Sequence, residues 1–140
     1  MKNFRIKVDP DYLQLIGRAT YTFSYLEWQI IYVGEKLKPG FLRDTRKCTA
    51  GQIANRFENL AKKTNPELRS RMIDLSSNFK ALVIRRNHLI HANPITDPQG
   101  EPRLHYSPAK TWQEEDIVAL INDFELCAAD GNNVFYKLLV

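Results

Sequence analysis

Several features that would assign the chain to a special class of protein are scarce or missing. Cysteine occurs only at Cys48 and Cys127, which are far apart and match no metal-ligand spacing, so we expect two reduced thiols. No apolar run approaches the length that spans a bilayer, and the N-terminal residues lack the apolar core of a signal peptide. These absences predict a cytoplasmic protein that does not associate with a membrane.

The composition is otherwise that of an ordinary globular domain. Of the 140 residues, 44% are hydrophobic and 26% are charged, and neither glycine nor proline is in excess. A chain of this length buries enough apolar surface to fold alone, so we expect residues 1–140 to form a single helical domain. The net charge of +4 favours an anionic partner such as RNA, although many proteins of similar charge bind no nucleic acid.

Four segments carry the three- and four-residue apolar spacing of amphipathic helices. The first is preceded by Asp9, a good capping residue, and starts with Pro10, whose missing N–H costs nothing there. The last follows Thr111-Trp112-Gln113-Glu114, which has the form of a capping box. The four helices are expected at about 11–38, 51–63, 66–90 and 112–130.

A polar stretch with four prolines, 92–110, separates the third and fourth helices. Within it, Asp97-Pro98-Gln99-Gly100 has the residues that a type I turn prefers, so a short hairpin folding back over 95–106 is expected. The alternation of Phe4, Ile6 and Val8 with polar residues suggests a short extended arm. The sequence therefore predicts an all-α fold, a four-helix bundle with a short hairpin or ordered loop inserted before the last helix.

One arginine interrupts the apolar stripe of the third helix. The stripe runs through Leu68, Met72, Leu75, Phe79 and Leu82, and its next two positions are Arg86 and Leu89. A guanidinium at a position that the pattern reserves for an apolar side chain is costly unless it is paired or faces a wet cleft. We therefore expect Arg86 to have a partner, either a carboxylate, carbonyl oxygens or the phosphate of a ligand.

Two further polar residues follow Arg86 near the helix end. Asn87 and His91 are four residues apart, so their side chains share a face and Asn87 can orient the imidazole. Arg86 and His91 lie roughly 140° apart on an ideal helix and are not neighbours. They meet if His91 leaves the helical register, or if two copies of the helix face each other across a twofold axis. We favour the second arrangement.

The segment Arg86-Asn87-x-x-x-His91 resembles the R-x(4–6)-H motif of the HEPN superfamily, in the variant with a polar residue after the arginine. The small helical fold, the position of the motif near the end of a long helix and the single helix that follows also resemble that family. The resemblance implies a metal-independent endoribonuclease of the toxin or antiphage-defence type, without cofactors. It also implies a homodimer whose two motifs form one cleft, and an antitoxin or regulatory protein as a further partner.

The chemistry of this class suits the three motif residues. RNA is cleaved when its own 2′-hydroxyl attacks the adjacent phosphorus, so RNA and not DNA is the expected substrate. His91 is then the general acid or base, Arg86 the clamp on the phosphoryl oxygens, and Asn87 the group that orients the imidazole. In some family toxins an antitoxin modifies a tyrosine two residues after the histidine. Asn93 occupies that position here, which argues against that mode of control.

Four other residues are weaker candidates for the site. His88 lies off the apolar stripe and is expected at the surface, since the His88–His91 pair has no evident third metal ligand. Arg85 also points off the stripe and is expected to be an exposed cation that can touch RNA phosphate. The hairpin carries His105 back towards the helix end, and Glu27 is one possible carboxylate partner for Arg86.

The first helix carries a second stripe opposite its apolar seam, formed by Tyr21, Tyr25, Trp28 and Tyr32. Packing against a second helix layer or a dimer partner is the favoured explanation, and stacking of RNA bases is the alternative. The alternative to an enzyme is a non-catalytic HEPN-like module that binds protein or RNA, with Arg86 in a structural role. A third, weaker hypothesis is a domain that binds nucleotide or RNA phosphate through Arg86 without cleavage.

Overall fold

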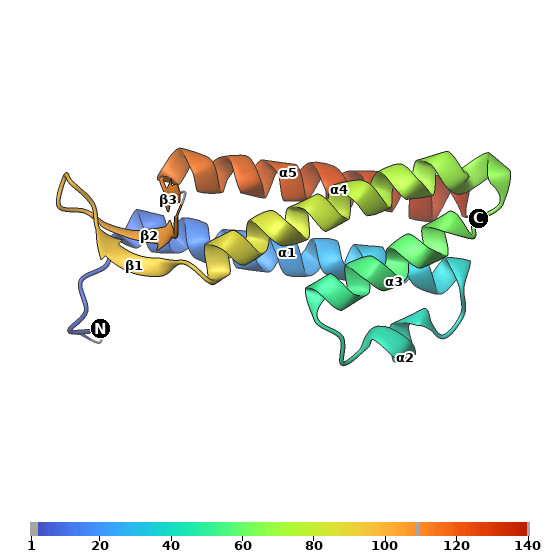
Figure 1. Ribbon diagram of the computed structural model, residues 1–140, viewed down its shortest axis with the longest axis horizontal. Helices are drawn as coiled ribbons and strands as arrows, with labels where there is room; N and C mark the ends of the chain where they lie inside the picture. The colour runs from blue at the N-terminus through green and yellow to red at the C-terminus, as the bar shows by residue number, and fades with distance from the viewer. Residues whose placement is uncertain (1–2, 109, 140) are drawn as a thin grey trace.

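The computed structural model describes residues 3–108 and 110–139. Figure 1 shows the long helices side by side along the length of the molecule, with a small sheet at one end and the shorter helices towards the other. The helices are α1 (Pro10–Leu37), α2 (Phe41–Thr45), α3 (Ala50–Lys62), α4 (Pro66–Ile90), α5 (Glu114–Asn133) and the π-helical turn η1 (Val134–Leu138). The strands are β1 (Asn93–Thr96), β2 (Pro102–Tyr106) and β3 (Lys110–Trp112).

The four predicted helices are confirmed, and local capping explains where they start. The Asp9 carboxylate accepts a hydrogen bond from the backbone N–H of Asp11 at 3.1 Å, directly before α1. Asn65 accepts one from Leu68 at 3.2 Å at the start of α4, which ends at Ile90 as expected. The five-residue helix α2 was not predicted, since it is too short to show an apolar period.

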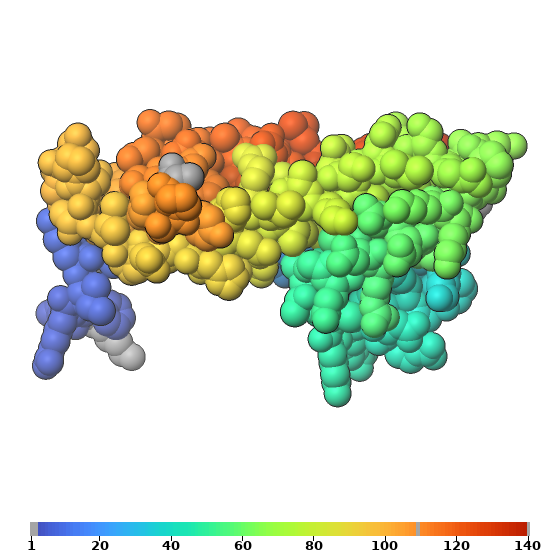
Figure 2. Space-filling model, viewed as in Figure 1, coloured from blue at the N-terminus to red at the C-terminus, as the bar shows by residue number. Residues whose placement is uncertain are grey.

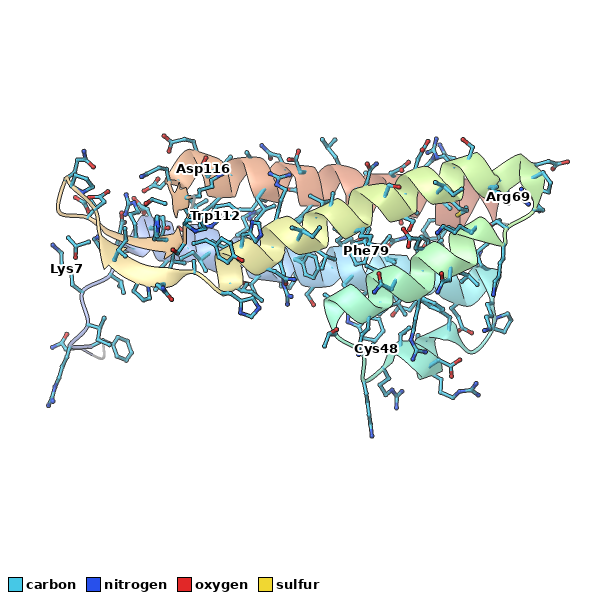
Figure 3. All side chains as sticks on the ribbon, viewed as in Figure 1. Lys7, Cys48, Arg69, Phe79, Trp112 and Asp116 are labelled. Atoms are coloured by element: carbon cyan, nitrogen blue, oxygen red, sulfur yellow. The ribbon has the colours of Figure 1, made fainter. Side chains whose placement is uncertain are left out.

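The predicted capping box at Thr111 is wrong. Thr111 and Trp112 belong to strand β3, and the box is formed instead by Gln113, whose backbone N–H donates to Asp116 at 2.9 Å. The Trp112 side chain is buried, and its backbone carbonyl accepts a hydrogen bond from the hydroxyl of Tyr12 at 2.7 Å. Burial of the indole and the hydrogen bond from Tyr12 of α1 therefore hold Trp112 in the sheet, and α5 starts only at Glu114. Trp112 and Asp116 are labelled at this end of the molecule in Figure 3.

The expected hairpin is present, but it belongs to a three-stranded antiparallel sheet with the order β1-β2-β3. The turn between β1 and β2 has the predicted chemistry, because the Asp97 carboxylate accepts hydrogen bonds from the backbone N–H groups of Gln99 and Glu101, both at 2.9 Å. Gly100 adopts a φ of 81°, a conformation that favours glycine. The fold is therefore mostly helical with a small sheet, and the predicted all-α class is wrong in this respect.

The core lies between the long helices and is rich in phenylalanine. Phe23 of α1 stacks on Phe79 of α4 with 6.1 Å between ring centroids, and meets the edge of Phe124 of α5 at 5.3 Å. These contacts join all three long helices where their predicted apolar seams converge. None of the helices in the described residues has the length and apolar character needed to cross a membrane.

Residues 3–9 do not form a regular strand. Phe4, Ile6 and Val8 are exposed, and the described residues before Pro10 lie outside helix and sheet. In the space-filling view of Figure 2 this segment projects from the end of the molecule that carries the sheet. The expected extended arm is therefore not part of the sheet.

Candidate functional site

Arg86 lies one turn before the end of α4 and is half-buried. Its guanidinium carbon lies 4.7 Å from the centroid of the Phe23 ring, a cation–π arrangement. Its Nη1 donates a hydrogen bond to the side-chain oxygen of Asn87 at 3.0 Å. The anomalous arginine of the apolar stripe is thus held by an aromatic face and a neutral oxygen, and neither of these cancels its charge.

The guanidinium borders a cavity of about 230 Å³ between α1 and α4. Its apolar walls come from Phe23, Leu89 and Phe124, and polar side chains of α1 line the rest of it, namely Thr20, Ser24 and Glu27. Apolar walls with a few convergent polar groups also line ligand sites, although this cavity is smaller than the roughly 300–1,000 Å³ that such sites usually have. Phe79 lies on the same stripe of α4, about two turns before Arg86, and is labelled in Figure 3.

Glu27 and Arg86 face the same cavity. Among the described residues they form no ion pair, so the expected carboxylate partner is near the guanidinium without being bonded to it. Burial raises the pKa of the Glu27 carboxyl, and the positive charge of Arg86 offsets part of that increase. The cavity therefore holds a fixed cation beside a carboxyl group that is protonated more readily than usual, a combination suited to proton transfer next to a phosphate.

His91 caps the C-terminus of α4 and is exposed. Its backbone N–H donates to the carbonyl oxygen of Asn87 at 3.0 Å. The described residues contain no hydrogen bond between the side chains of Asn87 and His91, and the Asn87 oxygen accepts one from Arg86 instead. The helix continues to Ile90, so Arg86 and His91 stay roughly 140° apart around its axis. A single chain holds Arg86 and Asn87 together but does not bring His91 to them.

The expected surface position of His88 is wrong. Its imidazole is half-buried and stacks on the ring of Tyr106 in β2, with 4.2 Å between centroids and 15° between planes. Its carbonyl oxygen accepts a hydrogen bond from the indole of Trp112 at 3.2 Å. These contacts dock the sheet onto the last turn of α4, so His88 positions the end of the motif helix.

The other two accessory candidates are both held by neighbours. His105 pairs with Asn93 in the sheet register, two residues beyond His91, and its Nδ1 lies 2.9 Å from the hydroxyl of Thr111. Arg85 forms an ion pair of 2.6 Å with Asp123 of α5. The Arg85 side chain is still 40% exposed, so its contact with RNA phosphate stays a prediction.

Sequence reasoning missed Phe23 as part of the site. Its position in the apolar seam indicates only a core residue, and the contact with Arg86 depends on how α1 and α4 cross. The residues that the structure describes contain no cluster of three or more His, Cys, Asp or Glu placed to hold a metal ion. Comparisons of the chain with protein-family models, with curated proteins and with solved structures found no match.

Proposed function

We propose that the protein is a metal-independent endoribonuclease that cleaves RNA by attack of the 2′-hydroxyl and acts as a homodimer. The observation that carries the proposal is the Arg86 guanidinium, held over Phe23 at a polar cavity and bonded to no carboxylate among the described residues. The resemblance of Arg86-Asn87-x-x-x-His91 to the HEPN motif supports the same class of reaction. In line with that resemblance, we propose a toxin or antiphage-defence role in the cytoplasm, controlled by an antitoxin or regulatory protein.

Each motif residue has a defined task in this proposal. A base takes the proton of the 2′-hydroxyl as its oxygen bonds to phosphorus, and an acid protonates the 5′-oxygen as its bond to phosphorus breaks. The products are a 2′,3′-cyclic phosphate and a free 5′-hydroxyl. Arg86 stabilises the charge on the phosphoryl oxygens, Asn87 positions Arg86, and His91 transfers protons. Glu27, on the same cavity, is the second candidate for proton transfer.

The position of His91 supports the proposed homodimer. It is exposed at the end of α4, on a different side of the helix from Arg86. An exposed histidine of one copy can reach the cavity of another, whereas the helical register keeps it from its own. We therefore propose that each site combines Arg86 and Asn87 of one chain with His91 of its partner.

A cleavage assay tests the proposal. Purified protein is incubated with single-stranded RNA in EDTA, and the product ends are analysed. We expect cyclic phosphate ends from the wild type, no product from Arg86→Ala or His91→Ala, and wild-type cleavage from Arg43→Ala, a matched control on the exposed surface of α2. Cleavage that survives both Arg86→Ala and His91→Ala contradicts the proposal.

One observation favours a second candidate function, a non-catalytic module that binds protein or RNA. Arg86 is half-buried and already satisfied by Phe23 and Asn87, as a purely structural residue would be. In that case Arg86→Ala lowers the melting temperature, and the wild type yields no RNA product under any condition. The same assay, read together with thermal unfolding, separates the two functions.

A further inference from the structure

The solvent face of α1 carries a row of exposed aromatic side chains that no other part of the described chain covers. Their exposed fractions are 75% for Tyr21, 57% for Tyr25, 44% for Trp28 and 45% for Tyr32, and Tyr136 of η1 beside them is 66% exposed. We call these five residues the aromatic groove. Two adjoining hollows of about 560 and 400 Å³ run along it between α1 and the C-terminal helices, and both are lined by Tyr25 and Asn132.

The size of the groove suits a protein partner. Together its five side chains expose on the order of 600 Å² of aromatic surface, at the upper limit for a patch that a monomer leaves bare. A stable complex buries about 800 Å² on each partner. The groove and a modest rim around it therefore supply the area that a dimer interface needs. Two of its rings, Trp28 and Tyr32, are packed against each other with 5.7 Å between their centroids, so these two side chains lose little freedom on binding.

The charges at the groove distinguish a second copy from RNA. Arg18 and Glu125 line the same hollow, one of each sign. Lys36, near the other end, lies over the Phe135 ring and donates to the carbonyl oxygens of Phe135 and Leu139, so it holds η1 in place. A track for single-stranded RNA needs an excess of cations along its aromatic rings, and Glu125 would repel phosphate. An aromatic surface whose two hollows are lined by one charge of each sign, Arg18 and Glu125, is instead typical of an interface between proteins.

We propose that the aromatic groove is the interface at which a second copy of this chain binds, with α1 against α1 about a twofold axis. The groove also adjoins the candidate site. Thr20, Ser24 and Glu27 of the Arg86 cavity each precede a residue of the groove by one position, about 100° around α1. The Arg86 cavity therefore lies at the rim of the interface, where a second copy can complete it. This inference deepens the proposed function but rests on separate observations.

The test is the mass of the protein in solution, measured by light scattering over a dilution series, with wild type compared with Tyr25→Glu. A charge at the middle of the groove is expected to weaken dimerisation at least tenfold. Leu126→Glu is the matched control, since this apolar side chain on α5 is 69% exposed but lines a different hollow, beside Arg85. We expect it to dimerise like the wild type. Circular dichroism of each variant verifies that it is folded.

Three outcomes overturn the inference: a wild type that is monomeric at every concentration, a Tyr25→Glu variant that dimerises as well as the wild type, or a Leu126→Glu variant that dissociates equally. A monomeric wild type whose RNA affinity falls in Tyr25→Ala would assign the groove to RNA. The two proposals fail separately. A dimer that cuts no RNA contradicts only the ribonuclease. A monomer that cuts RNA contradicts the interface and the site shared between two chains, but leaves the ribonuclease reaction standing.

Discussion

The guanidinium of Arg86 lies over the ring of Phe23, 4.7 Å from its centroid, at the place where α1 and α4 enclose the candidate site. The ring attracts the cation without neutralising it, and Asn87 adds a neutral acceptor at 3.0 Å. The result is a positive charge of fixed position beside a cavity. This is the property that stabilisation of a phosphoryl group requires, because such a charge needs no rearrangement when the reaction occurs.

Removing the Phe23 ring beneath Arg86 should have separate, measurable effects on stability and on RNA cleavage. Phe23→Leu keeps an apolar side chain in the core but loses the stacking on Phe79 and the cation–π contact. We expect unfolding in urea to become easier by about 1–2 kcal/mol. RNA cleavage at a temperature where the variant is fully folded should fall at least tenfold, because Arg86 loses its fixed position. Unchanged cleavage would show that Phe23 is only a core residue.

A negative charge at position 87 tests whether Arg86 needs a neutral hydrogen-bond acceptor there. Asn87→Asp places a carboxylate within hydrogen-bond distance of Arg86 and converts the contact into an ion pair. We expect the melting temperature to be maintained or raised, while RNA cleavage falls at least tenfold, about 1.4 kcal/mol of transition-state stabilisation. Cleavage rates and thermal unfolding on the same preparation measure both effects. An Asp variant as active as the wild type would contradict the role given to the uncancelled charge.

The raised pKa of Glu27 predicts how stability depends on pH. Because the folded state holds this proton more tightly than the unfolded state, protonation of Glu27 stabilises the fold below the ordinary pKa of 4.5. That contribution is lost as pH rises through the raised pKa. Glu27→Gln removes this dependence. The melting temperature of Glu27→Gln minus that of the wild type should therefore increase as pH rises from about 4.5 towards neutrality.

Calorimetry of both proteins across this pH range tests the prediction, and other titrating groups cancel because the two chains share them. A difference that is independent of pH, or that moves in favour of the wild type as pH rises, contradicts the assignment of the raised pKa to Glu27.

The two thiols should differ in reactivity. Burial raises the pKa of Cys127 to about 12, whereas Cys48, which packs against the edge of the core just before α3, is only half-buried. Since the thiolate is the reactive form, a thiol reagent should label Cys48 in the folded protein and Cys127 only after unfolding. Mass spectrometry of the labelled wild type and of Cys48→Ala measures this. Fast labelling of folded Cys48→Ala would contradict the burial of Cys127.

Much of the helical framework could be predicted because its determinants are local. The apolar seam of α1 follows from the helical period, and its centre is formed by Phe23, Leu26 and Ile30. Asp9 and Asn65 indicate where helices start, because their side chains accept hydrogen bonds from the first backbone N–H groups of the helix. Strand β3 was not predicted, because a segment of three residues is too short to show an alternation of apolar and polar side chains. Trp112 was assigned to a cap because the contact that holds it in the sheet comes from Tyr12, one hundred positions earlier in the chain.

In the candidate site, too, local sequence predicted some features, and others depend on contacts between distant residues. Helical register identified Arg86 as anomalous, but its partners depend on how the side chains pack. Neighbouring residues on a helix do not normally face each other, so the contact from Arg86 to Asn87 arises only because the guanidinium folds back at the cavity. His88 was expected at the surface, since nothing local to α4 indicates that Tyr106 folds back over it. Both features come from contacts between elements that sequence periodicity does not encode.

The central claim is that one active site combines Arg86 of one chain with His91 of its partner, and complementation tests it most directly. Arg86→Ala and His91→Ala chains, carrying different affinity tags, are co-expressed and purified as a mixed dimer. One of its two sites then keeps both side chains, so we predict cyclic-phosphate cleavage at about half the wild-type rate, while each variant alone is inactive. An inactive mixed dimer beside an active wild type would contradict the claim, because every site built within one chain would lack a residue.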